Sequence, residues 1–231
     1  MRLVAKCVIF VCGDEAKDAC GLDQLCAGLE AGIEGEIHAA CLLWQTHEAD
    51  EERGFLLVHA KNAFNKGNRI NMCWTVRYEW PCGARFTFNC VIGTGRSSWS
   101  EPAGSGHVLF IPSKEGVTRG DPLAMVTYGL SLLPLIRLLK KTIPDVHQPW
   151  YADDTGAGGK FKRIRLYFEK LQEFGPLRGY FPEPDKSILV VMAHTTQRKP
   201  KQALLALVFK LLLEADTLGA SLGGRPTRRL G

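Results

Sequence analysis

The strongest constraint on the fold is a short acidic segment in the second half of the chain. Residues 151–154 read Tyr-Ala-Asp-Asp, with Pro-Trp before them at 149–150 and a glycine-rich run after them at 155–159. This arrangement is typical of a tight hairpin between two strands. A turn lets the carboxylates of Asp153 and Asp154 approach one ion, and such oxygen ligands suit Mg²⁺. A solvated acidic turn is the alternative interpretation.

The apolar periodicity on both sides of this segment predicts alternating strands and helices. Residues 54–60 form a short apolar run opened by glycine, which is typical of a buried strand. The other expected strands are residues 86–92, 108–111, 150–155 and 188–192, and the expected helices are residues 35–47, 69–80, 121–141 and 161–174. Residues 93–106 lack a periodic pattern and are expected to form a loop. This order predicts an α+β fold with helices on one face of a small sheet.

The predicted helix 121–141 has clear boundary signals. Asp121 and Pro122 open it, and basic residues at its end complement the helix dipole. Pro134 inside the helix should kink it. Just before this helix lie Gly116 and Gly120, which allow close approach of the backbone to a base pair or template.

A second chemical segment ends the strand predicted at 54–60. Residues 59–65 read His-Ala-Lys-Asn-Ala-Phe-Asn. Phe64 would be placed to lie under a sugar ring, although an aromatic residue in the core is the alternative. His59 is either a metal ligand or the end of a strand that ligates nothing.

In this order, the segments resemble motifs A, B and C of reverse transcriptases. The family pattern is a strand ending in D-x-x-x-A-F, then G-x-x-Q-G-x-x-L, then Y-x-D-D, and the chain has counterparts at 59–64, 116–123 and 151–154. Residues 182–187 resemble motif D, residues 218–224 resemble the turn that follows, and residues 24–38 resemble the region before motif A. The amino-acid sequences of these motifs are similar to those of reverse-transcriptase-like domains of eukaryotic non-LTR retroelements.

This resemblance implies a polymerase palm, which is a ferredoxin-like antiparallel sheet with helices on one face. We expect residues 1–53 to be a partial fingers-like segment, residues 54–224 the palm and residues 225–231 a basic tail. The implied activity is RNA-directed DNA polymerisation by two-metal nucleotidyl transfer. The implied partners are an RNA or DNA template-primer and deoxynucleoside triphosphates.

The resemblance also assigns roles to individual residues. Asp153 and Asp154 would hold Mg²⁺, or Mn²⁺ in its place. Phe64 would exclude the ribose 2′-hydroxyl, and Gly120 would let the backbone approach the nascent base pair. Lys186 would lie near the triphosphate as a proton donor.

Two positions depart from the family pattern. His59 stands where the family has the carboxylate that bridges both ions, and imidazole is a ligand that carries no negative charge. Loss of that bridge should reduce the rate on the order of 10³-fold or more. Arg119 replaces the family's Gln, and it cannot accept a hydrogen bond as an amide does.

Three hypotheses about function therefore stand. The first is an RNA-directed DNA polymerase domain impaired by His59. The second is an inactive, degenerate palm that binds nucleic acid or a protein partner. The third is a metal-dependent phosphotransferase that uses Asp153 and Asp154 with His59, and the ordered motifs argue against it.

Composition adds bounds on the class of protein. Of the 231 residues, 45% are hydrophobic and 23% are charged, which excludes wholesale disorder, and the net charge of +5 suits a nucleic-acid partner. No apolar run approaches the ~20 residues that cross a bilayer, and the N-terminus lacks the cleavage site of a signal peptide. We therefore expect an intracellular protein without a membrane span. The eight cysteines lack CxxC spacing, so buried free thiols are favoured over a metal cluster at positions 7, 12, 20 and 26.

Overall fold

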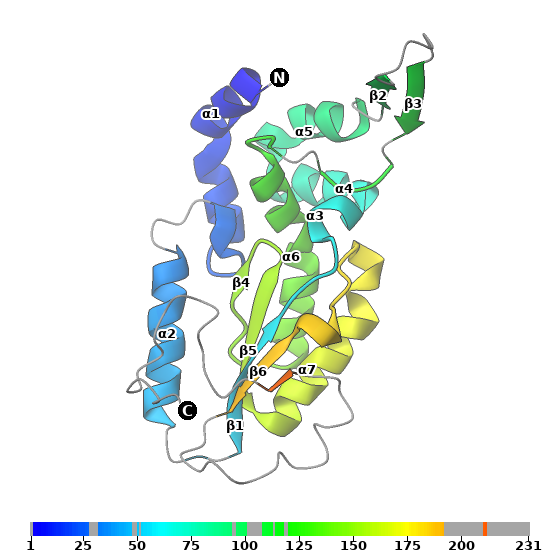
Figure 1. Cartoon of the computed structure of the whole chain (residues 1–231). Helices are drawn as coiled ribbons and strands as arrows, with labels where there is room; N and C mark the ends of the chain where they lie inside the picture. Colours follow the sequence, from blue (N-terminus) through cyan, green and yellow to red (C-terminus); the bar gives the residue numbers. More distant parts are fainter. Residues whose placement is uncertain are drawn as a thin grey trace, which may run out of the picture.

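A five-stranded sheet lies at the centre of the fold (Figure 1). The computed structural model describes residues 2–27, 32–47, 50, 52–93, 96–100, 108–112, 114–117, 120–191 and 210–211. The sheet order is β4-β5-β1-β6-β7. Its strands are β1 (Arg53–Val58), β4 (Trp150–Tyr151), β5 (Asp154–Lys160), β6 (Ile188–Val191) and β7 (Lys210–Leu211). The first four strands of this order pair antiparallel, and β7 pairs parallel with β6.

Strand β1 holds the central position, and it carries the segment that resembles motif A. It pairs with β5 from Arg53↔Lys160 to Val58↔Thr155, and with β6 from Gly54↔Val191 to Leu57↔Ile188. Leu56 and Val58 are buried. Because β1 lies between β5 and β6, its C-terminal end meets the start of β5, where the acidic turn lies.

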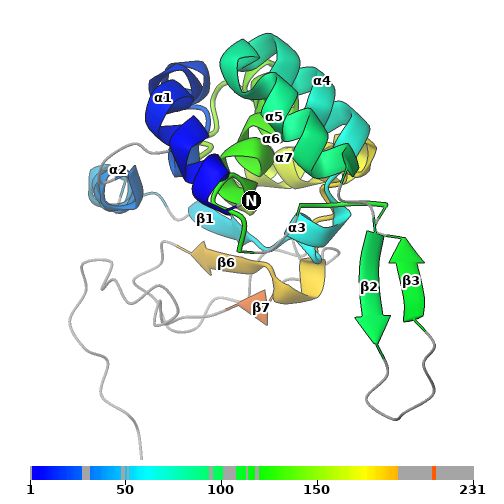
Figure 2. The same ribbon diagram turned by 90° about the horizontal axis from the view of Figure 1, so that it is seen from above.

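Helices cover one face of this sheet (Figure 2). The longer ones are α1 (Arg2–Cys20), α2 (Gly32–Thr46), α4 (Arg69–Glu79), α5 (Pro81–Gly93), α6 (Ala124–Thr142) and α7 (Phe161–Phe174). The short ones are α3 (Ala63–Lys66) and the 3-10 turns η1 (Leu25–Ala27), η2 (Pro176–Arg178) and η3 (Pro184–Lys186). Helix α7 packs against β1 and β5. The predicted α+β class, with helices on one face of a mainly antiparallel sheet, is confirmed.

Helix α6 is the central helix of the core, with buried side chains from Thr127 to Leu139. Just before its start, the Asp121 carboxylate accepts a hydrogen bond from the Leu123 backbone N–H at 3.0 Å. Pro134 lies inside the helix as predicted. The helices expected at 35–47, 69–80, 121–141 and 161–174 correspond to α2, α4, α6 and α7.

Two predictions in the middle of the chain were wrong. Residues 86–92 belong to helix α5 and not to a strand, because the buried positions Gly83 and Thr87 recur at helical spacing and Pro81 opens the helix. The loop expected at 93–106 contains strand β2 (Arg96–Ser100), which pairs antiparallel with β3 (Val108–Pro112). This hairpin stands beside the main sheet (Figure 2).

Helix α1 packs into the same core as the central sheet. Its buried residues Ala5, Cys12, Ala16 and Cys20 share one apolar cluster with α6 and β1. Cys12 forms a disulfide with Cys82 of α5, which corrects the expectation of a free thiol at position 12. Packing of α1 along α5 brings together two residues that lie 70 positions apart in the sequence. Cys20 and Cys26 are buried free thiols as predicted, and Cys7 is exposed.

None of the described helices combines the length and the apolar content needed to cross a membrane. The basic tail at 225–231 and the turn expected at 218–224 lie outside the described residues.

Candidate active site

The acidic segment forms the predicted hairpin. Trp150 pairs with Thr155 and Tyr151 pairs with Asp154, which leaves Ala152 and Asp153 as a two-residue turn between β4 and β5. Ala152 has a φ of 53°, in the left-handed region. Two-residue hairpin turns need such a positive φ because their twist then matches that of the strands. A non-glycine residue pays about 1 kcal/mol for this conformation.

Side-chain hydroxyl groups make hydrogen bonds to the backbone of this hairpin. The Tyr180 hydroxyl donates to the Asp153 backbone carbonyl at 3.0 Å. The Thr155 hydroxyl donates to the Pro149 carbonyl at 2.8 Å and lies 2.9 Å from the Tyr167 hydroxyl. The Trp150 ring packs edge-on against Tyr180, with 5.5 Å between ring centroids. These contacts fix the backbone that carries both carboxylates.

Sequence reasoning missed Tyr167, Tyr180 and Gln24 as supports of this hairpin. Gln24, in the loop between α1 and η1, makes hydrogen bonds to both the N–H and the C=O of Ala152. The only sequence signal was that residue 24 begins the stretch resembling the region before motif A.

The end of β1 approaches the acidic turn, as the sequence predicted. The His59 Nδ1 atom lies 4.0 Å from the Asp154 Oδ1 atom, and their side chains are 45% and 72% exposed. The His59 carbonyl accepts a hydrogen bond from the Glu183 backbone N–H at 2.8 Å. The His59 backbone N–H lies 3.4 Å from the Ser187 hydroxyl. The turn at 182–187 therefore supports the backbone at position 59.

The electrostatics of the turn are those of two neighbouring carboxylates. Desolvation raises the pKa of the Asp154 carboxyl, the Asp153 charge raises it further, and His59 opposes both effects. Burial also raises the pKa of the Tyr128 hydroxyl on α6, with smaller contributions from Asp153 and Asp154. The charges of the two aspartates therefore act on each other and on the Tyr128 hydroxyl of α6.

The segment resembling motif B joins this site through backbone contacts. The Val117 N–H donates to the Phe64 carbonyl at 2.7 Å, and the Gly116 N–H donates to the Gly67 carbonyl at 2.8 Å. Gly116 has a φ of 70°, and a Cβ there would collide with the Phe64 carbonyl. The close approach at Gly116 is therefore to the protein's own backbone, which corrects the expectation of a contact with a base pair.

The two other described positions of the predicted nucleotide site lie around this junction. The Phe64 ring packs on Tyr128 with 4.7 Å between centroids, and Phe64 is partly buried. Gly120 is exposed with a φ of 80°, and a Cβ there would lie 3.0 Å from the Arg2 guanidinium. Arg119 lies outside the described residues.

Lys186 lies in η3, next to the end of β1. Its Nζ atom is 3.0 Å from a carboxylate oxygen of Glu183, and its side chain is 61% exposed. Since the Glu183 N–H bonds to the His59 carbonyl, this pair belongs to the same corner of the fold. The structure therefore brings His59 and Asp154 together, and the turn that carries Lys186 bonds to the backbone at position 59.

The donors at this turn are of the chemical type that a hard divalent cation binds. Asp153 and Asp154 provide two carboxylates on adjacent residues, which suits an ion whose other ligands are water and phosphate. Where a third carboxylate would be shared between two ions, the chain offers an imidazole 4.0 Å from Asp154. Within the described part of the chain, no group of three or more His, Cys, Asp or Glu side chains could hold a metal ion.

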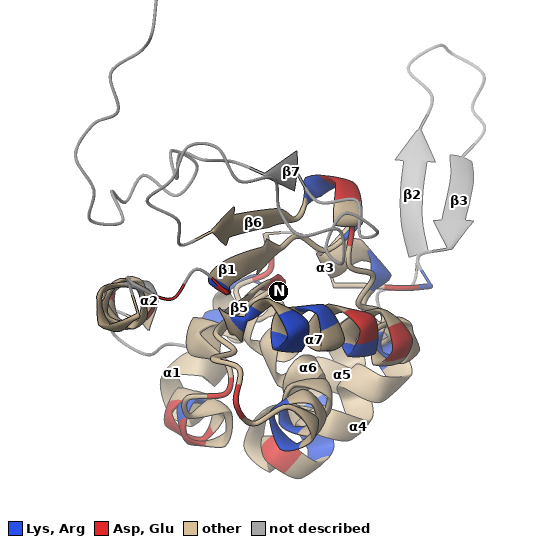
Figure 3. Ribbon diagram, turned by 90° about the horizontal axis from the view of Figure 1, so that it is seen from below, with Lys and Arg blue, Asp and Glu red and all other residues tan. Residues whose placement is uncertain are grey.

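Helix α7 begins with basic residues, which Figure 3 shows in blue ahead of the acidic residues further along the helix. Arg163 pairs with Asp145, and Arg165 pairs with Glu169. Exposed pairs of this kind are typical of a solvated face.

Comparison with solved structures supports the assignment of the fold. The apo telomerase of Candida tropicalis matches with a TM-score of 0.63 and 8% identity over 81% of this chain. The same telomerase truncated from its C-terminal domain matches with a TM-score of 0.57 and 9% identity over 83%. A Candida albicans telomerase in complex with the TWJ fragment of telomeric RNA matches with a TM-score of 0.52 and 10% identity over 83%.

The chain spans between 35% and 41% of the length of these three telomerase chains. No protein-family model and no curated protein sequence matches it. At such low identity, the likeness shows the fold alone. The chain therefore has a reverse-transcriptase-like fold.

Proposed function

We propose that this chain is the palm of a reverse transcriptase related to those of eukaryotic non-LTR retroelements. In this proposal it catalyses RNA-directed DNA synthesis, and His59 impairs the reaction. The observation that carries the proposal is the 4.0 Å approach of His59 to Asp154. It brings the segments resembling motifs A and C to one point, as nucleotidyl transfer requires.

In this proposal Asp153 and Asp154 hold Mg²⁺, with Mn²⁺ as a substitute. When bound, the metal supplies Lewis-acid activation of the primer 3′-hydroxyl and neutralises charge on the triphosphate. The support for this role is the chemistry of the donors, because two neighbouring carboxylates disfavour each other's ionisation unless a cation is present. The raised pKa of Asp154 reflects that repulsion in part.

The other residues position the nucleotide. Phe64, whose ring packs on Tyr128, would act as a steric barrier to a ribose 2′-hydroxyl. Gly120 would let the backbone approach the nascent base pair, and Arg119 next to it would contact phosphate. Lys186 moves from Glu183 to the triphosphate and gives a proton to the leaving group.

His59 sets the level of activity. An imidazole cannot replace an anionic bridge between two cations, so we expect a rate loss on the order of 10³-fold or more. The chain's partners would be an RNA or DNA template-primer and deoxynucleoside triphosphates. A telomeric RNA fragment bound to one structural neighbour supports the RNA class of partner.

Primer extension on an RNA template, with Mg²⁺ and separately with Mn²⁺, tests this proposal. We expect trace synthesis by the chain and on the order of 10³-fold more by the His59→Asp variant. The matched control is His59→Asp combined with Asp154→Asn, which should abolish synthesis. Equal activity of the chain and the His59→Asp variant would refute the role given to His59.

A second candidate is a palm that binds nucleic acid without catalysis. It is favoured by the missing third carboxylate at position 59. Binding of a labelled RNA–DNA hybrid without extension by either the chain or the His59→Asp variant would select this candidate. Its affinity should fall with salt, because phosphate contacts release counterions.

A further inference from the structure

The side chain that contacts the candidate catalytic turn most directly is Gln24. It is fully buried. Its Nε2 atom donates to the Ala152 carbonyl at 3.1 Å, and its Oε1 atom accepts from the Ala152 N–H at 2.8 Å. Both the amide nitrogen and the amide oxygen of Gln24 therefore bond to the backbone of a single residue, which lies 128 positions away in the sequence. A buried amide that lacks hydrogen-bond partners destabilises the folded state, so these two hydrogen bonds are strongly favoured.

The residue that Gln24 holds is the one in the unusual conformation. Ala152 has a φ of 53° and directly precedes Asp153. Residues with a side chain seldom adopt this conformation, and hairpin turns prefer glycine where it is needed. An alanine turn therefore benefits from a clamp outside the hairpin.

Gly129 of helix α6 leaves space for the Gln24 side chain, because it has no Cβ atom. A Cβ added at Gly129 would lie 2.9 Å from the Gln24 Cγ atom and 2.7 Å from the Cys26 Sγ atom. The Cys26 thiol in turn lies 3.7 Å from the Met125 carbonyl on the same helix. Gln24 is therefore enclosed between α6 on one side and the hairpin on the other.

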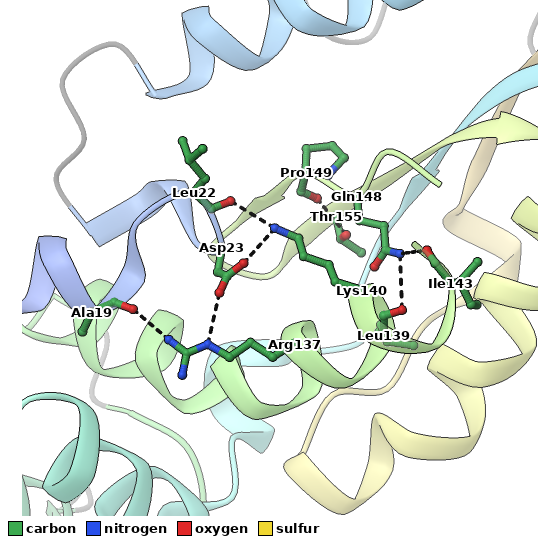
Figure 4. A network of polar contacts seen from close by, with 10 residues as sticks. All are labelled: Ala19, Leu22, Asp23, Arg137, Leu139, Lys140, Ile143, Gln148, Pro149 and Thr155. Atoms are coloured by element: carbon green, nitrogen blue, oxygen red, sulfur yellow. Dashed lines mark hydrogen bonds and ion pairs between the residues drawn. The ribbon is translucent and has the colours of Figure 1, made fainter. Parts of the chain in front are cut away.

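The loop that carries Gln24 is fastened to α6 by charged groups (Figure 4). Asp23 accepts hydrogen bonds from Arg137 Nε at 3.1 Å and from Lys140 Nζ at 2.9 Å. Lys140 also donates to the Leu22 carbonyl at 3.2 Å, and Arg137 donates to the Ala19 carbonyl at 3.0 Å. These contacts hold the chain at Asp23 and just before it, next to the residue whose amide bonds to Ala152.

We propose that Gln24 is a positioning residue for the acidic turn: it locks Ala152 in its left-handed conformation and thereby aims Asp153 and Asp154 at their common cation. This role rests on the proposed function for its catalytic meaning. The conformational part stands on the geometry of the hairpin itself. Polar groups that orient metal ligands typically change metal affinity by 10–100-fold when removed.

The test uses the full chain and two matched variants. Gln24→Met keeps the volume of the side chain and removes both hydrogen bonds. Gln148→Met is the control, because Gln148 is also a buried amide and donates to the Ile143 carbonyl at 2.8 Å (Figure 4). The hydrogen bonds of the Gln148 side chain go to Leu139 and Ile143 and not to Ala152. Hydrogen exchange of the Ala152 amide and Mn²⁺ binding followed by electron paramagnetic resonance are measured for each, in the parent chain and in the His59→Asp variant.

We expect Gln24→Met to speed exchange of the Ala152 amide about tenfold or more beyond the effect of Gln148→Met. We also expect it to weaken Mn²⁺ binding by the His59→Asp variant about tenfold. Gln24→Glu adds a pH signature, since its carboxyl can remake both hydrogen bonds only when protonated. Protection of the Ala152 amide, corrected for the intrinsic exchange rate, should therefore return as the pH falls.

The outcomes separate this inference from the proposed function. Equal Ala152 exchange in Gln24→Met and Gln148→Met overturns the positioning role, whatever the metal does. Faster Ala152 exchange in Gln24→Met with unchanged Mn²⁺ affinity overturns the link from the turn to the metal. Faster exchange with no Mn²⁺ binding by any variant supports the clamp on Ala152 and removes the proposed metal site.

Discussion

The two halves of the candidate site differ in how they are held. On the hairpin side, buried groups bond to the backbone around Asp153, including Tyr180 and Thr155. On the strand side, the backbone of His59 is tied to the turn at 182–187, but its side chain is 45% exposed. The hairpin side has both carboxylates of the motif C pattern, Asp153 and Asp154. The strand side has His59 where the motif A pattern has a carboxylate.

This difference shows that scaffold and chemistry are separable in this fold. The position of residue 59 depends on backbone pairing of β1 with β5 and β6, which does not require a particular side chain there. A change from carboxylate to imidazole therefore costs the fold little, while it would cost nucleotidyl transfer a great deal. The predictions below test this contrast, from the largest expected effect to the smallest.

Removal of the buried support should damage the hairpin half far more than the strand half. Trp150 is fully buried against Tyr180, so Trp150→Ala should lower the free energy of unfolding by about 3–5 kcal/mol. The His59→Ala change should stay within about 0.5 kcal/mol, as is usual for exposed sites. Urea denaturation measures both changes.

Trp150→Phe is the control for this first prediction. It keeps an aromatic ring and removes the indole N–H, which has no hydrogen-bond partner among the described residues. Its cost should be much smaller than that of Trp150→Ala. Equal losses for His59→Ala and Trp150→Ala would show that the two halves are anchored alike, and the contrast would fail.

Restoring a carboxylate on the strand side should make stability depend on metal. His59→Asp places a third negative charge next to Asp154, so the variant should be less stable than the parent without divalent ions. Saturating Mg²⁺ at about a hundred times its Kd should then add about 2.7 kcal/mol. Thermal unfolding with and without Mg²⁺ measures this gain, and the parent should gain less.

The metal effect should also depend on pH in a defined direction. The pKa of Asp154 is raised from its ordinary value of 3.8, so this carboxyl takes up a proton at a higher pH than an ordinary aspartate. Protons and Mg²⁺ compete for the same carboxylate oxygens, so stabilisation by a fixed Mg²⁺ concentration should weaken as the pH falls. A gain from Mg²⁺ that grows on acidification would contradict the assignment of Asp154 as a ligand.

The sequence predicted the hairpin half well because its signals are local. The acidic pair, the flanking proline and the glycine-rich strand lie within about a dozen residues, and the structure forms the turn that they indicate. The meeting of His59 with Asp154 followed from the order of the segments in the resemblance. Contacts such as Gln24 with Ala152 could not be predicted, because they join residues 128 positions apart without a repeating pattern.

The errors in secondary structure have physical causes as well. In α1, small side chains such as Ala5 and Ala16 are buried, while Phe10 and Val11 are exposed. This reverses the usual apolar pattern, so the helix was not predicted. In α5, alternation of Phe86 and Phe88 with polar residues indicated a strand, but tertiary packing selected the helix.

The loop beside the hairpin should depend on its charged contacts with α6. Arg137 bonds to Glu79 at 2.6 Å and to Asp23 at 3.1 Å, and Arg137→Ala should cost about 1 kcal/mol. Arg163→Ala, which breaks an exposed pair with Asp145, is the matched control and should change stability little. Chemical denaturation of the two variants measures the difference.

The pH dependence of this contact follows from Asp23. Burial alone would raise the pKa of Asp23, but its hydrogen bonds with Lys140 and Arg137 outweigh burial and lower the pKa. The stabilisation is complete above the ordinary value of 3.8 and is lost as the pH falls through the lowered pKa of the folded state. The parent's advantage over Arg137→Ala should therefore shrink in acid. An advantage that grows in acid would show that Asp23 is not the partner that matters.

The smallest effect concerns the strain in the turn itself. Ala152 adopts a φ of 53°, so Ala152→Gly should stabilise the fold by about 0.5–1 kcal/mol, because glycine adopts this conformation without a steric cost. Ala157→Gly in β5 is the matched control, and it should destabilise by about 1 kcal/mol because Ala157 is a buried strand residue. Opposite signs for the same substitution would locate the strain at the turn. If both variants are destabilised equally, the Ala152 conformation carries no cost, and the hairpin half needs no clamp to hold it.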